Sequence, residues 1–407
     1  MTLSAAASPP EFDFFAPATI ANPHPMLHRM REASPAYFSP QLRGWFLTRH
    51  ADVSAVAKDG KMGVGPLTGV FQALPEAVRA QLEPLRKSVS MWMGHTVHAD
   101  HLRFQSLLKR YFTPAMVEKL RPRIRQVTDE LIDAVEGQGR MEVNRDFGRK
   151  LPAYVIGEML GMPRTDEDAL LRWSYHLSAI FQSFDLERLT ASQESVREMT
   201  EYMRGVVAQH RKAPQTRESI LDVFLAAEKE GLVSEEEILA NCSLLLFAGH
   251  ETTASLICKG LLTLLRHPDQ WALLKKDPSL VPQAVEEMLR YCDITNVLPR
   301  VATEPTEVAG QKVAPGQVLF LSYAAANRDP AVFPEPDRFD ITRKPGRHLT
   351  FGFGAFYCLG AALARVEGQV AFETLARRLP HLRLDGEPVV EPTRPMGKHV
   401  HALPVAF

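Results

Sequence analysis

The chain has 407 residues, 45% of them apolar, and a formal net charge of −1, so it is long enough to bury a large core. Its basic residues are dispersed, which excludes the electrostatic signature of nucleic-acid binding. No run reaches the roughly 18 apolar residues that a membrane span needs, and the first residues lack the regions of a signal peptide, so we expect a soluble, cytoplasmic protein.

The pattern of elements predicts a mainly α-helical fold with small β-sheets. Residues 1–20 are rich in Ala and Pro and are expected to be poorly ordered at the start. A strand is predicted at Trp45–Thr48 and a helix at Val53–Ala57. Almost continuous helix follows from about residue 100 to 274, broken at Pro and Gly positions. Short strands such as Val318–Ser322 come after residue 295, and the C-terminal end reads as a short sheet.

The longest predicted helix runs from about Ser234 to Arg266, without Pro and with a strong apolar bias. Ala248, Glu251 and Thr252 are separated by three and four residues, so they share one helix face, which Leu244 extends by one turn. Such a Glu and Thr can relay protons. Taken alone, a Thr that bonds back to its own helix and an exposed Glu are the commoner interpretation.

Cys358 lies in a Gly-rich loop that leads directly into an Ala-rich helical segment. Free N–H groups and the positive end of the helix dipole stabilise an anionic sulfur at such a place. A single thiolate disfavours zinc or an iron–sulfur cluster, which need several ligands, whereas haem iron needs only one. A buried apolar thiol is the alternative. The other cysteines, at 242, 258 and 292, show no metal spacing and are expected in the core.

At this loop the chain resembles the cytochrome P450 family of haem-thiolate monooxygenases. Phe351, Gly354, Cys358 and Gly360 match the family's cysteine signature, whereas Phe356 stands where the signature has His or Arg. The resemblance spans nearly the whole chain. It implies one continuous haem domain over residues 1–407, with the cytochrome P450 fold of the bacterial, soluble type, and haem b bound through Cys358.

The resemblance also assigns roles within the long helix. Small Ala248 and Gly249 would leave room for dioxygen beside the iron. Glu251 would relay protons inward and the Thr252 hydroxyl would donate a hydrogen bond to the oxygen, which makes these two the family's acid–alcohol pair.

Glu287 and Arg290 lie three residues apart in a predicted helix from Pro282 to Tyr291. An isolated pair of this kind is usually a solvated surface pair. The resemblance implies that they are buried and completed by an Arg from the Pro-rich segment that follows, which we assign to Arg338. We interpret the three as a structural lock on the haem loop, with Glu286 as the competing partner of Arg290.

Haem propionates need cationic partners, because an unpaired buried charge is costly. The resemblance places His101 and Arg300 there. Gln105, however, stands where the family usually has Arg, so with Phe356 two usual contacts are absent. The haem contacts that we expect are His101, Arg300, Phe351, Gly352, Ala248 and Gly360, with His348 or His98 as a substitute for the missing ones.

The resemblance implies a monooxygenase that inserts one atom of O2 into an apolar organic substrate. No dinucleotide, flavin or iron–sulfur motif occurs, so the electrons are expected from a separate ferredoxin and ferredoxin reductase, docking on Arg103, Lys109, Arg110 and Arg347. The protein is expected to be a monomer. By analogy the pocket would suit a fatty acid, terpenoid or macrocyclic polyketide and be lined by Met91, Trp92, Phe181, Leu244, Ala248, Val297, Leu298 and Met396.

Two other classes remain open. A peroxide-driven enzyme has the same fold but little need of the Glu251–Thr252 pair. A haem protein that senses gas or carries electrons usually fills the sixth iron position with a protein ligand or lacks the pair.

Overall fold

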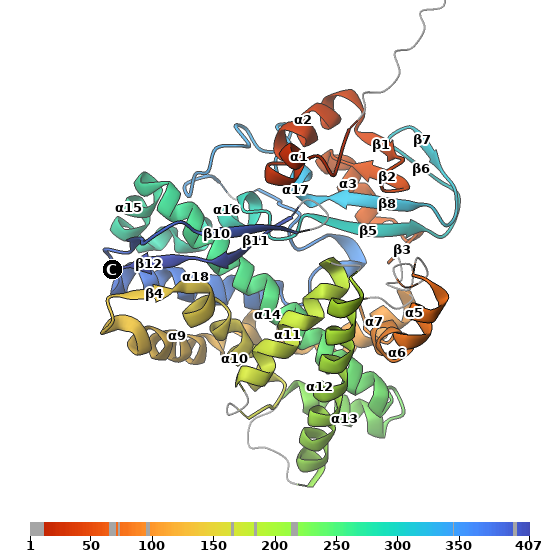
Figure 1. Cartoon of the computed structure of the whole chain (residues 1–407), viewed down its shortest axis with the longest axis horizontal. Coiled ribbons are helices and arrows are strands. Elements are labelled where there is room, and N and C mark those ends of the chain that lie inside the picture. The colour runs from red at the N-terminus through yellow and green to blue at the C-terminus, as the bar shows by residue number, and fades with distance from the viewer. Residues whose placement is uncertain are drawn as a thin grey trace, which may run out of the picture.

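Helices fill most of the molecule, and short β-sheets lie along one side and one end (Figure 1). This is a computed structural model, which describes residues 12–64, 71, 74–94, 98–163, 167–182, 185–212, 219–344, 346–393 and 397–407. The mainly α architecture with small sheets is confirmed. None of the helices in these ranges is both long and apolar enough to span a bilayer.

Helix α14 lies centrally among the helices and packs against α10, α11, α12, α15, α16 and α18 (Figure 1). In chain order the helices are α1 Pro17–Ala21, α2 His24–Ala33, α3 His50–Lys58, α5 Glu76–Gln81, α6 Glu83–Ser90, α7 His98–Leu108, α8 Pro114–Glu118, α9 Arg121–Glu136, α10 Lys150–Met159, α11 Glu167–Gln182, α12 Leu186–Lys212, α13 Ile220–Lys229, α14 Glu235–Arg266, α15 Pro268–Lys276, α16 Val281–Tyr291, α17 Tyr323–Ala326 and α18 Ala361–Arg378. Shorter turns of helix are η1 Lys109–Phe112, η2 Asn144–Gly148, η4 Pro278–Leu280 and η5 Gly354–Phe356.

Helix α14 begins and ends where its sequence predicts. Ser234 caps it by accepting the Glu237 N–H, while the Glu237 carboxylate accepts the Ser234 N–H, so two otherwise unpaired donors are satisfied. The first turn is acidic and the last carries Arg266, which suits both ends of the helix dipole. The predicted helix from Ser234 to Arg266 is therefore confirmed.

The largest sheet has five strands in the order β1-β2-β8-β5-β3, with β2 and β8 parallel and the other pairs antiparallel. The smaller sheets are β4-β12-β9, β10-β11 and β6-β7. The strands are β1 Ala36–Ser39, β2 Gly44–Leu47, β3 Met62–Gly63, β4 Arg140–Glu142, β5 Val297–Ala302, β6 Thr306–Val308, β7 Gln311–Val313, β8 Val318–Ser322, β9 Arg383–Leu384, β10 Val389–Thr393, β11 Gly397–Ala402 and β12 Pro404–Ala406.

Residues 12–20 correct one prediction. Phe12 and Phe14 are buried against Tyr37 and Phe46, with ring centroids 5.1 and 4.8 Å apart, and α1 begins at Pro17. The expectation of disorder was wrong for this part because two aromatic rings bury apolar area against β1 and β2. Residues 1–11 lie outside the described part of the chain.

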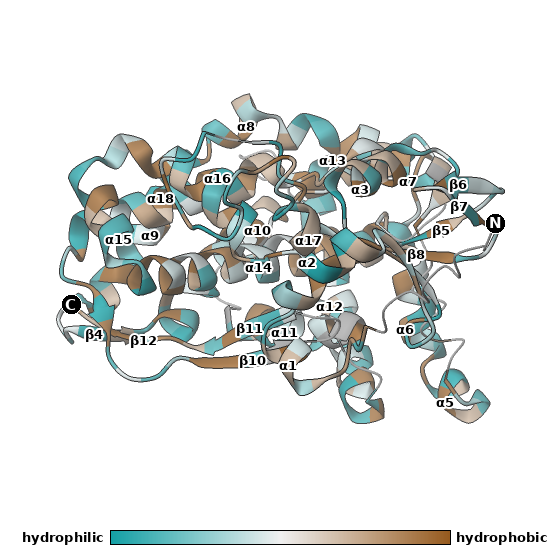
Figure 2. Cartoon of the chain, turned by 90° about the horizontal axis from the view of Figure 1, so that it is seen from above, coloured by the Kyte–Doolittle hydropathy of each residue, from teal (hydrophilic) through white to brown (hydrophobic). Residues whose placement is uncertain are grey.

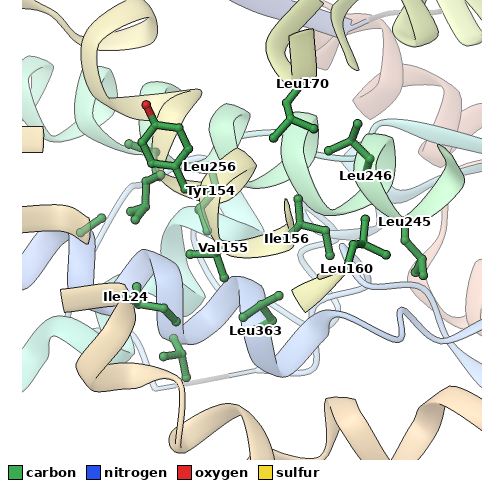
Figure 3. Packing of buried hydrophobic residues seen from close by; sticks show 14 of the residues in the cluster. Ile124, Tyr154, Val155, Ile156, Leu160, Leu170, Leu245, Leu246, Leu256 and Leu363 are labelled. Carbon is green, nitrogen blue, oxygen red and sulfur yellow. The ribbon is translucent and has the colours of Figure 1, made fainter. Parts of the chain in front are cut away.

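The core lies where α9, α10, α11, α14 and α18 meet, and Figure 3 shows its side chains interdigitating. Gly249 of α14 faces α10, where an added Cβ would lie 3.0 Å from Ile156 Cγ1. This glycine thus allows two helices to pack closely and does not make room for dioxygen. Most helices carry both hydrophilic and hydrophobic residues (Figure 2), as expected for helices with one face in a core.

Candidate functional site

The Cys358 loop is held by its own backbone ahead of α18. The Cys358 N–H donates to Phe351 O at 2.8 Å, and α18 begins three residues later. Gly354 has φ +74°, and an added Cβ would lie 2.6 Å from Ala57 O, so only glycine fits there. Gly360 differs: it has φ −82° and no atom within 4 Å of an added Cβ, so it keeps open space beside Cys358.

The surface of the Cys358 residue is accessible, yet enough protein surrounds its sulfur for desolvation to raise the pKa of the thiol. The Gly360 N–H and the charge of Arg365 act in the opposite direction. The other cysteines are fully packed, and burial raises the pKa of the Cys242 thiol to about 12 and of Cys292 to about 11, as expected for core residues.

A short stretch of α14 is accessible on one face, although the residues before and after it in the sequence are buried. Ala248 and Thr252 are exposed, whereas residues 238–246 and 253–254 are buried. The Thr252 hydroxyl donates to Ala248 O at 2.8 Å, which is the bond within the helix that the sequence left open as an alternative. A hydroxyl bound in this way can still turn to another acceptor on the same face.

Glu251 lies half-buried beside a fixed positive charge. Its Oε1 is 3.5 Å from Arg149 Nη2 and 3.6 Å from His250 Nδ1. Burial, reinforced by the charge of Arg149, lowers the pKa of His250 to about 3, so this imidazole is neutral at pH 7. Nothing local in the sequence pointed to Arg149, which lies 102 positions before Glu251.

The structural lock contains Arg343 and not Arg338. Glu287 and Arg290 are buried and joined by two bonds of 2.7 Å, and Arg343 Nε donates to Glu287 Oε1 at 3.2 Å. The Arg338 side chain is 59% exposed and pairs with Glu335. The prediction of Arg338 was wrong because only its backbone carbonyl faces the lock, where it accepts from Arg290 and Arg343.

Glu286 and His348 pair with each other, which corrects two further predictions. Glu286 accepts from His348 Nε2 at 3.1 Å and from Arg365 Nε at 2.6 Å, so it does not compete for Arg290. The other nitrogen of His348 accepts the Thr350 N–H. With both nitrogens engaged, His348 presents no donor to a propionate. The side chain of the other substitute, His98, lies outside the described part.

Arg300 and His101 come from distant elements to one side of the Cys358 loop. Arg300, on β5, is 3% exposed; its Nη1 donates to Pro299 O at 2.9 Å, and no carboxylate of the described residues pairs with it. Burial accordingly lowers the pKa of this guanidinium. His101 Nε2 lies 3.1 Å from Ala355 O, and Gln105 Nε2 donates to the same oxygen at 2.9 Å.

These features fit a haem. A buried guanidinium without a carboxylate partner suits an anionic group such as a propionate. The exposed residue Cys358, the open space at Gly360 and the exposed Ala248 of α14 suit a flat cofactor. Cys358 would hold the iron and Arg300 a propionate, whereas both ring nitrogens of His101 are engaged, Nδ1 with Met93 O at 2.8 Å and Nε2 with Ala355 O at 3.1 Å.

The residues that were predicted to line the substrate pocket differ in their burial. Met91 is half-buried, Leu298 is 38% exposed, and Val297 and Leu244 lie at the edge of the core. Trp92 is fully buried and stacked on Phe247, so it was wrongly placed in the pocket wall. Met396 and the side chain of Phe181 lie outside the described part.

Asn241 is a residue that the sequence did not single out. Its amide accepts the Met93 N–H at 2.8 Å and donates to Met91 O at 3.0 Å, which fastens the loop at 91–93 to α14. A buried Asn in an apolar helix segment was the available signal.

The comparisons agree with this site. A family model described as cytochrome P450 matches residues 70–401. The chain is 34% identical to the biotin biosynthesis cytochrome P450 of Bacillus subtilis (strain 168), covering 94% of each chain, and 41% identical to cytochrome P450 CYP107DY1 of Priestia megaterium, covering 89% of each.

Two solved structures have closely similar folds. P450BioI in complex with an acyl carrier protein ligated to hexadec-9Z-enoic acid has a TM-score of 0.88 and 33% identity, covering 96% of this chain and 100% of that one. Myxobacterial CYP267B1 with myristic acid has a TM-score of 0.84 and 38% identity, covering 97% and 98%. The chain therefore belongs to the cytochrome P450 family and is a bacterial haem b monooxygenase.

Proposed function

We propose that this monooxygenase hydroxylates or epoxidises an apolar substrate of the fatty-acyl or macrocyclic polyketide type, with Glu251 and Thr252 delivering protons. The overall reaction consumes substrate, O2, two electrons and two protons and yields oxygenated substrate and water. The observation that carries the proposal is the accessible face of α14, where Ala248 and Thr252 are exposed one turn apart and Glu251 directly precedes the Thr252 alcohol. Haem ligated by a cysteine thiolate supplies the oxidising chemistry when it is bound.

The chain's own part is to move protons and exclude water. The Glu251 carboxylate lies 3.5 Å from Arg149, and the next residue, Thr252, is exposed on the accessible face. A proton taken up by the Glu251 carboxylate can pass to the Thr252 hydroxyl, which then donates from the inner side. The apolar residues of the core behind α14 keep bulk water from this route.

The test is Thr252→Ala, with Thr252→Ser as the matched control that keeps a hydroxyl. In the alanine variant we expect reductant consumption to continue while hydrogen peroxide replaces product. In the serine variant product formation should stay near the parental level. Unchanged coupling in the alanine variant would contradict the proton-delivery role and favour the peroxide-driven class.

Cys358→Ala tests the iron ligand. It should abolish the red-shifted absorption band of the reduced carbon monoxide complex, because only a thiolate ligand produces that band. Cys242→Ala, a change at a buried core cysteine, should retain it. Retention of the band without Cys358 would refute the ligand assignment.

The substrate class is proposed from the relatives' ligands. The neighbours include P450s solved with hexadec-9Z-enoic acid on a carrier protein, with myristic acid and with epothilone D. The accessible Leu298 and half-buried Met91 suit such apolar chains. A screen of the ferric haem spectrum should show a shift on addition of fatty acids or macrolides. A response to terpenoids alone would overturn the assignment.

A ferredoxin is proposed as the electron donor, docking beside the Cys358 loop. There a cavity of about 600 Å³ is lined by Lys58, Arg347 and Phe353, and the two cations lie 4.6 and 4.0 Å from the Phe353 ring. Acidic partner surfaces suit such a site. Arg103, expected in the same patch, is already paired with Glu237.

Charge reversal tests this docking face. Arg347→Glu should raise the apparent Michaelis constant for ferredoxin, and more so at low salt, because screening weakens exposed charge pairs. Arg103→Glu is the comparison and should have the smaller effect. Equal constants for Arg347→Glu and the parent would refute docking here.

A further inference from the structure

Phe356 stands between the two residues that were predicted from the sequence to hold the haem propionates. Its ring centroid lies 5.0 Å from the Arg300 guanidinium carbon and 4.3 Å from the His101 ring, which is tilted by 41°. The three residues come from β5, α7 and the loop before Cys358, so three elements far apart in sequence meet at one aromatic ring.

The backbone next to this ring is held from the same side. His101 Nε2 and Gln105 Nε2 both approach Ala355 O, at 3.1 and 2.9 Å. Because Gln105 donates to this carbonyl, its amide serves to position the loop. The two positions where the family has further cations therefore carry a loop anchor, Gln105, and an aromatic ring, Phe356.

Arg300 has little else to orient it. It is 3% exposed, its printed hydrogen bond runs to the adjacent Pro299 carbonyl, and no carboxylate of the described residues pairs with it. A guanidinium over an aromatic face is attracted by the ring quadrupole, and more strongly when desolvated. The Phe356 ring is thus one of the contacts that hold this buried cation, beside the Pro299 carbonyl and the nearby Tyr323.

We propose that Phe356 is a positioning residue for haem binding: its ring holds the buried guanidinium of Arg300 toward the site of the haem propionates, where the family uses further cations. The proposal deepens the haem assignment and holds whatever the substrate is. It makes haem retention unusually dependent on Arg300, because neither Gln105 nor Phe356 adds a charge.

The experiment measures the rate at which holoenzyme transfers haem to excess apomyoglobin, a readout that needs no turnover. Phe356→Leu keeps apolar bulk but removes the ring, and we expect transfer roughly thirtyfold faster, the size of a desolvated cation–π contact. Phe356→Tyr keeps the ring and should transfer haem at the parental rate. A residue that only fills space would show the same rate in both variants, which would overturn the proposal.

A double-mutant cycle identifies the partner. Arg300→Met should accelerate haem transfer, and adding Phe356→Leu should then have little further effect, because the ring acts through the cation. Fully additive effects would overturn the proposal.

Phe353→Leu is the matched control. Its ring lies in the same loop and also contacts two cations, Lys58 and Arg347, but on the side of the docking cavity. Haem transfer at the parental rate is expected, and acceleration equal to that of Phe356→Leu would overturn the proposal. If Phe356→Leu yields no holoenzyme, the Phe356→Tyr variant still tests the proposal. Because that variant keeps the ring, roughly thirtyfold faster haem transfer from it would be incompatible with a contact that depends on the ring.

Discussion

Arg343 should contribute far more to the free energy of unfolding than Arg338, although the two lie in the same Pro-rich segment. Arg343 is 14% exposed at its side chain; it donates to Glu287 at 3.2 Å and to the carbonyls of Pro334, Glu335 and Arg338 at 2.6, 3.0 and 3.0 Å. Arg338 is 59% exposed and approaches Glu335 at 3.5 Å.

The magnitudes follow from burial. Removing one partner of a buried ion pair costs about 3–5 kcal/mol, because the remaining charge and carbonyls lose their donors. An exposed pair is worth about 0–1 kcal/mol. Arg343→Ala should therefore destabilise the protein by several times more than Arg338→Ala. Arg343→Lys should fall between them, since lysine keeps the charge but not the planar fork.

The assay is urea unfolding of the holoenzyme, followed by haem absorbance and by far-UV circular dichroism. Because a bound cofactor complicates two-state analysis, the quantity to compare is the unfolding midpoint among variants at equal protein concentration. Equal midpoint shifts for Arg343→Ala and Arg338→Ala would refute the reasoning that Arg343 completes the lock.

Two further predictions concern the same region. Burial by itself would raise the pKa of Glu286, but hydrogen bonds from His348 and Arg365 outweigh it and lower the pKa to about 2. This stabilisation, on the order of 3 kcal/mol, is present above the ordinary pKa of 4.5 and is lost as the pH falls toward 2. In the Glu286→Gln variant the urea unfolding midpoint should therefore depend less on pH between 4.5 and 2 than in the parent. Parallel plots of midpoint against pH for the two proteins would contradict this. Gly354→Ala should reduce the haem content of the purified protein, because the added Cβ would lie 2.6 Å from a backbone carbonyl oxygen. Gly360→Ala is the comparison, since its Cβ would meet no atom within 4 Å, and the apoprotein of this variant should fold normally. Equal unfolding midpoints for the apoproteins of the two variants would argue against a strained loop at Gly354.

Some elements and the Cys358 loop could be predicted from the sequence because their signals are local. A Pro-free segment with an apolar bias predicted α14 from Ser234 to Arg266, and a strand-like run predicted β8 at Val318–Ser322. The Gly-rich turn before an Ala-rich helix predicted Cys358 as the ligand of the haem iron. Each signal lies within a few residues, where backbone geometry and hydrogen bonding act directly.

Only the tertiary structure decided which distant groups meet. Arg343 and Arg338 are indistinguishable in sequence, yet one points inward and the other into solvent. Phe356 meets a histidine 255 positions earlier. Such contacts depend on how whole helices and strands pack, because burial and close approach arise from the summed fit of the core, which no short segment encodes.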